Sequence, residues 1–104
     1  MFSLDDLART IAARAGANGE KSYTKSLLEK GAPACARKFG EEAIEFVIAT
    51  ISQDAAAVSA EAADVVYHLL VALQARGVAL AQVLAELERR TAVSGLEEKA
   101  SRKT

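Results

Sequence analysis

The sequence predicts an all-α fold, a bundle of about four to five helices in one domain. The chain has 104 residues, which suits a single domain but is near the small end for a self-sufficient core, so oligomerisation is expected. Alanine, the best helix former, is the most frequent residue, and the chain contains a single proline. Hydrophobic residues make up 51% and charged residues 26%, which excludes a disordered chain.

Helix start and stop signals divide the chain into five helical segments. Ser3 and Asp6 resemble a capping box, with aspartate where glutamate or glutamine is usual. Asp54 suits the N-cap position of the longest segment. The expected helices cover residues 4–15, 22–30, 33–51, 55–76 and 80–92. Residues 1–95 then form the all-α domain, and residues 96–104 are a charged C-terminal tail of the same domain.

Charge and cysteine content exclude several classes of protein. The net charge of −1 argues against a chain that coats nucleic acid. Cys35 is the single cysteine, which excludes a disulfide framework and a multi-cysteine zinc site, and we expect it to be structural. No continuous apolar run reaches the roughly 20 residues that cross a bilayer, and the acidic N-terminus is unlike a signal peptide. We therefore expect a cytoplasmic protein that binds neither nucleic acid nor membrane.

Two pairs of carboxylates lie beside the apolar stripes of the two longest expected helices. In each pair the acids are three residues apart, so both side chains share a face of their helix. The short connection between the two helices makes them antiparallel neighbours, which brings the two pairs together. The four residues are Glu42, Glu45, Glu61 and Asp64. We expect them to converge on one point of the bundle.

Four convergent carboxylates repel one another and need protons or cations. An all-oxygen set of ligands suits Mg²⁺, with Mn²⁺ as a possible replacement. Mg²⁺ usually takes further oxygens from substrate phosphates, which indicates cleavage of a phosphoanhydride by a metal-activated water. The alternative is that both pairs lie on solvated helix faces, as in a non-catalytic helical interaction module.

The residues around these acids resemble the MazG-like all-α nucleoside triphosphate pyrophosphohydrolases. The superfamily pattern is present as Glu41-Glu42-x-x-Glu45 and, in the next helix, as Glu61-x-x-Asp64. Further blocks, spread over nearly the whole chain, resemble the phosphoribosyl-ATP pyrophosphohydrolase family within that superfamily. They are Ser-Tyr-Thr at 22–24, Lys-Phe-Gly-Glu-Glu at 38–42, Glu-Ala-Ala-Asp-Val-Val-Tyr-His-Leu-Leu at 61–70, Ser-Gly at 94–95 and Glu-Lys-Ala-Ser-Arg at 98–102.

The resemblance implies a MazG-like helical bundle that is completed by dimerisation. It also implies Mg²⁺-dependent hydrolysis of phosphoribosyl-ATP to phosphoribosyl-AMP and pyrophosphate, a step of histidine biosynthesis. The family's metal ligands map onto Glu42, Glu45, Glu61 and Asp64. Glu41 joins these four as a catalytic candidate with three open roles, which are holding a metal-bound water, acting as a base, or facing solvent.

Six further residues are candidates for substrate binding, from their chemistry and from the resemblance. They are Tyr23, Thr24, Lys38, His68, Lys99 and Arg102. Lys38 can contact a substrate phosphate, or form a surface ion pair one helical turn from an acid. His68 can orient a ligand, bind a phosphate, relay a proton, or be a hydrogen-bonded structural residue.

The other four candidates have structural alternatives as well. Tyr23 and Thr24 begin a short helix, where hydroxyl groups can bind anions; the structural alternative is capping of the helix by Ser22 or Thr24. Lys99 and Arg102 can fold over a polyanionic substrate or belong to a solvated terminus. Tyr67 points elsewhere on its helix, which favours a subunit contact.

Gly40 lies inside an expected helix. Within a helix a glycine costs about 1 kcal/mol relative to alanine, and close helix packing near the metal site would explain Gly40.

A second enzyme hypothesis keeps the metal chemistry and changes the substrate to ordinary or damaged nucleotides. A panel of substrates separates this hypothesis from the pathway enzyme.

Overall fold

The computed structural model describes residues 1–16 and 22–92, and in these ranges every regular element is an α-helix. The prediction of an all-α chain is confirmed, and the ends of the helices lie close to the expected positions. The helices are α1 (Leu4–Ala15), α2 (Tyr23–Glu29), α3 (Ala32–Ser52), α4 (Ala55–Arg76) and α5 (Leu80–Thr91).

Local capping interactions set the ends of these helices. The Ser3 side chain accepts from the Asp6 backbone N–H and the Asp6 carboxylate accepts from the Ser3 N–H, so the expected capping box is present. The Asp54 carboxylate accepts from the backbone N–H of Ala57 and begins α4. Gly77 ends α4 in the left-handed conformation, at φ 74°, which glycine adopts without strain.

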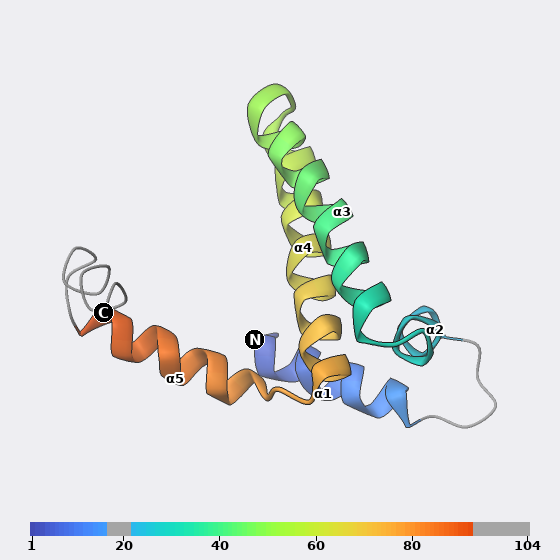
Figure 1. Cartoon of the computed structure of the whole chain (residues 1–104). Helices are drawn as coiled ribbons and strands as arrows, with labels where there is room; N and C mark the ends of the chain where they lie inside the picture. Colours follow the sequence, from blue (N-terminus) through green and yellow to red (C-terminus); the bar gives the residue numbers. More distant parts are fainter. Residues whose placement is uncertain (17–21, 93–104) are drawn as a thin grey trace, which may run out of the picture.

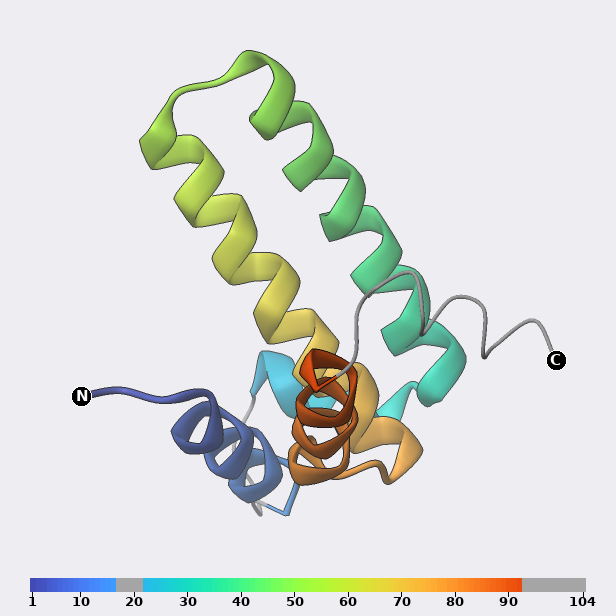
Figure 2. The ribbon, with the colours of Figure 1, turned by 90° about the vertical axis from the view of Figure 1, so that its left-hand side faces the viewer.

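A long helical hairpin of α3 and α4 dominates the architecture (Figures 1 and 2). The two helices run antiparallel, with only a short turn between them at the far end of the hairpin. Helices α1 and α2 pack across the other end, which we call the base of the hairpin, and α5 extends away from it (Figure 1). The chain therefore presents an elongated hairpin on a small helical base.

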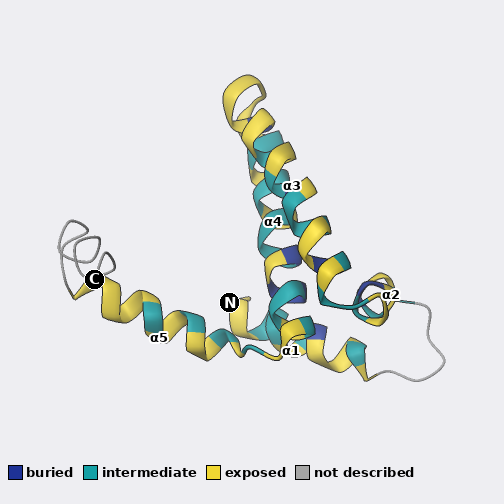
Figure 3. Ribbon diagram, viewed as in Figure 1, coloured by how far each residue is buried: buried dark blue, intermediate teal, exposed yellow. Residues whose placement is uncertain are grey.

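The buried apolar core lies at the base, where α1 and α2 meet the hairpin (Figure 3). Ile11 and Val71 are fully buried there, beside Leu27 and Leu70. Cys35 belongs to the same cluster, its Sγ donates to the Leu27 carbonyl at 3.2 Å, and burial raises the pKa of its thiol. A buried thiol with a raised pKa is a poor nucleophile, which agrees with the structural role expected for this cysteine.

The outer face of α3, which points away from α4, is apolar and exposed. Four large aliphatic side chains with exposed fractions of at least 50% lie on it. They are Ile44, Val47, Ile48 and Ile51. Helix α5 has no buried residue, and its Leu84 and Leu87 are exposed too. Within the described residues, much of the apolar surface therefore has no partner.

Helix α4 is long and apolar enough, by length and composition alone, to cross a membrane, with a mean hydropathy of 1.5 over its most apolar part. Its apolar residues do not form a continuous run of that length, in keeping with the sequence expectation. The middle of α4 carries Glu61, Asp64 and His68, and ionisable residues are costly inside a bilayer. Packing against α3 explains the apolar character of α4 without a membrane.

Candidate metal centre and its hydrogen-bond network

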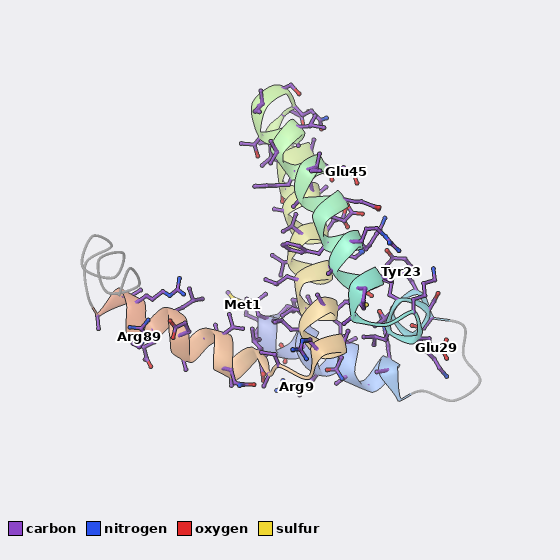
Figure 4. All side chains as sticks on the ribbon, in the orientation of Figure 1. Met1, Arg9, Tyr23, Glu29, Glu45 and Arg89 are labelled. Carbon is purple, nitrogen blue, oxygen red and sulfur yellow. The ribbon has the colours of Figure 1, made fainter. Side chains whose placement is uncertain are left out.

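Three carboxylates meet between the two helices of the hairpin. Glu42 and Glu45 come from α3 and Glu61 comes from α4, and one oxygen from each lies within 4.8 Å of the others. The spacing of three residues places both acids of α3 on one side of that helix. The antiparallel partner helix then brings Glu61 opposite them. Figure 4 shows Glu45 well along α3 from the base, whereas Tyr23, the first residue of α2, lies nearer the base. We call these three residues the carboxylate triad.

The three carboxylates differ in their surroundings. Glu42 is buried, Glu61 is half-buried and Glu45 is exposed. Among the described residues, the Oε2 atom of Glu61 is buried and has no hydrogen-bond partner. The negative charge of Glu42 raises the pKa of Glu45, and burial and Glu61 act in the same direction while Lys38 opposes them. The triad therefore carries more negative charge than its neighbours compensate.

The triad fits a divalent cation of the hard class. All of its donors are carboxylate oxygens, which are the ligands that Mg²⁺ and Mn²⁺ prefer. A cation would also satisfy the buried Oε2 of Glu61, since an unpaired buried oxygen is costly. It would relieve the repulsion that raises the pKa of Glu45.

Asp64 and Glu41, the other two acidic candidates, lie outside the triad. Asp64 is exposed, and its carboxylate is not within the group of oxygens that meet between the helices. Its charge instead contributes to raising the pKa of Tyr23. Glu41 is exposed on α3 and forms an ion pair with Lys38 at 3.7 Å. The metal role of Asp64 and the catalytic role of Glu41 therefore stay predictions.

Lys38 links the triad to its surroundings. Its Nζ lies 3.3 Å from Oε1 of Glu42 and 3.7 Å from Oε1 of Glu41. The hydrogen bond to Glu42 raises the pKa of Lys38, and the nearby Tyr23 acts in the same direction. The ion pair expected one turn away on the helix is therefore present. It places a positive charge at the edge of the triad.

Two hydrogen bonds connect α2 to α4 next to these residues. The Tyr23 hydroxyl lies 2.9 Å from Nε2 of His68, and the Thr24 hydroxyl bonds to the hydroxyl of Tyr67. The Nδ1 atom of His68 lies 2.7 Å from the backbone carbonyl oxygen of Asp64. Burial raises the pKa of Tyr23, as do Glu42, Tyr67 and Asp64, while Lys38 lowers it. The rings of Tyr23, Tyr67 and His68 also contact one another.

This network bears on two details of the sequence interpretation. Tyr67 bonds to Thr24 inside the chain, and its expected subunit contact stays a prediction. Of the two expected capping residues of α2, Ser22 is the cap and accepts from the backbone N–H of Lys25, whereas Thr24 is fully buried. Helical periodicity gives the direction of a side chain but not the partner that another helix supplies. The pairing between α2 and α4 had no signal in the spacing of residues.

The explanation offered for Gly40 is also wrong within this chain. A Cβ atom added to Gly40 would meet nothing within 4 Å, so no helix of the described part packs closely against it. A small hollow of about 130 Å³ lies further towards the base, between α2 and α3. Its lining residues include Lys30, Arg37, Lys38 and Glu41, and Lys38 also forms the ion pair with Glu42 of the triad.

Lys99 and Arg102, the two candidates in the C-terminal tail, lie outside the described residues. The predicted boundary between residues 95 and 96 also lies outside the described residues. The roles of Lys99 and Arg102 and the position of this boundary stay predictions.

Comparisons with known proteins identify the family of this chain. The family model "Phosphoribosyl-ATP pyrophosphohydrolase" matches residues 4–91. The chain is 61% identical to "Phosphoribosyl-ATP pyrophosphatase 1" of Bradyrhizobium diazoefficiens, over 98% of this chain and 96% of that protein. It is 59% identical to "Phosphoribosyl-ATP pyrophosphatase" of Dinoroseobacter shibae, over 98% of this chain and 100% of that protein. This likeness extends over all of the described helices, the two that hold the triad included, so the chain belongs to the phosphoribosyl-ATP pyrophosphohydrolase family.

Proposed function

We propose that this protein hydrolyses phosphoribosyl-ATP to phosphoribosyl-AMP and pyrophosphate, as a step of histidine biosynthesis. Membership of the family and the names of close relatives support the substrate and the reaction. The observation that carries the proposal in this chain is the carboxylate triad, in which three acids from two helices lie within 4.8 Å. Solvated helix faces, the alternative reading of these acids, would not bring them together between the helices.

Glu42, Glu45 and Glu61 would hold the divalent cation, Mg²⁺ with Mn²⁺ as a possible replacement. Asp64, one turn further along α4, would complete the set through a change of side-chain rotamer. When bound, the ion supplies charge neutralisation for the phosphates and a water that is easier to deprotonate. Glu41, which is exposed and forms an ion pair with Lys38, keeps its three candidate roles of holding a metal-bound water, acting as a base or facing solvent.

Lys38 and Tyr23 are the residues best placed to contact the triphosphate. Lys38 presents its ammonium group beside Glu42, and Tyr23 is half exposed, with its hydroxyl bonded to His68. His68 is buried behind Tyr23, and Thr24 is fully buried, so each supports the site from within. Lys99 and Arg102 would add cations from the tail, where arginine offers a bidentate grip on phosphate.

The exposed outer face of α3 supports the expected homodimer. Ile44, Val47, Ile48 and Ile51 form an apolar surface on an otherwise well-formed helix. Such contiguous apolar surfaces mark interfaces between proteins. A second copy of the chain would bury them and add the core that a chain of this length lacks. The protein would work in the cytoplasm, without nucleic acid or membrane as a partner.

Pyrophosphate release tests this function directly. Phosphoribosyl-ATP is supplied with and without Mg²⁺, beside ATP and dCTP as controls, and we expect fast, Mg²⁺-dependent release from phosphoribosyl-ATP alone. E45Q should lower the rate by about 100-fold or more, since even the neighbours of metal ligands cost 10–100-fold when lost. E88Q, which removes an exposed carboxylate from α5, is the matched control and should keep full activity.

The other outcomes distinguish the alternatives. Comparable activity on ATP or dCTP would keep the metal centre and move the protein to the hydrolysis of other nucleotides. Absence of release from any substrate, together with no Mg²⁺-induced rise of the melting temperature, would leave a non-catalytic interaction module.

A further inference from the structure

The small hollow between α2 and α3 lies outside the carboxylate triad and has the opposite charge. Its volume is about 130 Å³, and it is found where α2 lies beside the beginning of α3 (Figure 1). Its lining residues are Leu27, Lys30, Ala34, Arg37, Lys38 and Glu41. Three cations and one acid give this lining a formal charge of +2. Such a concave, positively charged surface suits an anion.

The turn between α2 and α3 and the spacing of residues on α3 build this hollow. Only Lys30 and Gly31 separate the two helices, and Gly31 has a φ of 94°, which glycine adopts without strain. Lys30 therefore lies beside the first turns of α3 and lines the hollow with them. Ala34, Arg37 and Glu41 follow one another at intervals of three and four residues, so they share one face of α3. The small side chain of Ala34 leaves the space open.

Two of the three cations in the hollow have no counter-charge in the described part of the chain. Lys38 pairs with Glu41 at 3.7 Å and with Glu42 at 3.3 Å. Neither Lys30 nor Arg37 forms an ion pair or a side-chain hydrogen bond with a described residue. Both are exposed, so their side chains are free to turn towards a ligand. The excess positive charge of the hollow thus lies on Lys30 and Arg37.

A polyphosphate held by a divalent cation matches the triad and the hollow together. Lys38 belongs to both, because it lines the hollow and its Nζ contacts Glu42. Phosphate oxygens are the usual further ligands of a Mg²⁺ ion at carboxylates such as these. In a triphosphate the next phosphate is only one bridging oxygen away, so it lies close to the metal-bound one. The phosphate on the phosphoribosyl group is much further off, because a ribose and the base separate it from the triphosphate.

We propose that the hollow between α2 and α3 is the subsite for the two terminal phosphates of the substrate, which leave together as pyrophosphate, and that Lys30 and Arg37 bind them. The proposal rests on the proposed function and deepens it. Arginine offers a bidentate grip on phosphate, and lysine adds a point charge. The subsite directs the free end of the triphosphate towards α2 and the nucleoside away from it.

Solvated surface cations and a site for the phosphoribosyl phosphate are the competing explanations. The two reaction products separate them, because the products share no phosphate. Pyrophosphate contains the two terminal phosphates of the substrate. Phosphoribosyl-AMP keeps the phosphoribosyl phosphate and the first phosphate of the triphosphate. Loss of a cation from the hollow therefore weakens the binding of the product whose phosphate it contacts.

Calorimetric titration of the full-length protein with each product in Mg²⁺ buffer measures this without turnover. We expect R37Q and K30Q each to raise the dissociation constant of pyrophosphate about tenfold, the effect of one hydrogen bond to a charged group. The affinity for phosphoribosyl-AMP should stay unchanged. R76Q removes an exposed cation from the last turn of α4, outside the lining of the hollow, and is the matched control. It should keep both affinities.

Steady-state kinetics on phosphoribosyl-ATP give a second measurement. R37Q should raise KM by about tenfold and keep kcat, because a contact made equally in the bound substrate and in the transition state changes binding alone. R76Q should keep both constants. An unchanged KM in R37Q would overturn the subsite. Circular dichroism checks that each variant folds, which we expect because the changed side chains are exposed.

The remaining outcomes separate the inference from the proposed function. An active enzyme in which R37Q and K30Q bind pyrophosphate as the wild type does, or a wild type that binds no pyrophosphate, would overturn the subsite and keep the function. Weaker binding of phosphoribosyl-AMP alone, or of both products equally, would overturn the assignment to the terminal phosphates. A wild type that binds pyrophosphate through Arg37 but does not hydrolyse phosphoribosyl-ATP would overturn the function and leave a pyrophosphate site.

Discussion

At the scale of single residues, the three acids of the triad share their excess charge unequally. Glu42 is balanced by Lys38 at 3.3 Å, and Glu61 keeps a buried oxygen without a partner in the described part of the chain. The repulsion is most visible at Glu45, whose pKa is raised chiefly by Glu42. In the protein without metal, the ionised form of Glu45 therefore destabilises the fold.

This charge predicts how stability depends on pH and on Glu45. Because folding raises the pKa of Glu45 above its ordinary value of 4.5, its stabilising contribution is full below that value and is lost as pH rises through the folded pKa. E45Q cannot ionise, so in EDTA at neutral pH it should melt at a higher temperature than the wild type. Its melting temperature should also change less between acidic and neutral pH.

Thermal unfolding in EDTA across this pH range checks the expectation, with E88Q as the control for loss of a distant carboxylate. A lower melting temperature of E45Q at neutral pH would contradict the repulsion argument. Mg²⁺ should raise the melting temperature of the wild type and have little effect on E45Q, because binding to the folded state stabilises it.

The composition of the triad shows what sequence reasoning could reach at this scale. Glu42, Glu45 and Glu61 were predictable because helical spacing fixes the direction of each side chain. Asp64 was grouped with them on the same argument, but its carboxylate lies outside the cluster. The missing information is the axial register between α3 and α4, which depends on packing between the helices and not on the periodicity of either.

At the scale of elements, the helix ends were predictable and the surroundings of each helix were not. Ser3, Asp54 and Gly77 act within one turn of the helices they begin or end, so their effect is visible in the local sequence. Gly40 needed knowledge of the space around α3, which turns out to be open within the described chain. The tie between α2 and α4 through Tyr23 and His68 was hidden for the same reason.

Open space at Gly40 predicts the effect of G40A. Alanine favours a helix interior over glycine by about 1 kcal/mol, and its methyl group would meet no atom within 4 Å here. The free energy of unfolding should therefore rise by about 0.5–1 kcal/mol, as measured by urea denaturation. A fall in the free energy of unfolding would instead show that another molecule contacts α3 at Gly40 in solution. The steady-state kinetics of G40A would then show whether that contact lies at the site or at the subunit interface.

At the scale of the whole molecule, the core is too small for the apolar residues available. Hydrophobic residues make up 51% of the chain, yet the described core is a cluster at the base of the hairpin. The sequence showed that apolar stripes exist but not which of them a single chain buries. The all-α class followed from composition and caps, whereas the exposed course of α5 and the bare outer face of α3 required the arrangement in space.

The exposed face of α3 predicts a dimer that a single charge can disrupt. I48E places a carboxylate in the middle of the aliphatic surface, where burial of an unpaired charge is costly. The variant should sediment as a monomer in analytical ultracentrifugation while its circular dichroism stays helical. T50E, on another exposed side of the same helix, is the matched control and should stay dimeric. A monomeric wild type, or a dimeric I48E, would contradict the predicted interface.

The carboxylate triad lies entirely within one helical hairpin, and this has a kinetic consequence. Its residues come from α3 and α4, which a short turn connects, so the chain closes only a small loop to bring them together. Pairings of this kind are among the earliest that a helical protein can make. As the hairpin forms, however, it must bring three negatively charged side chains close together, and their repulsion opposes this step. A divalent cation in the refolding buffer would reduce that repulsion. The ion that the folded enzyme binds would therefore also increase the rate at which its binding site forms.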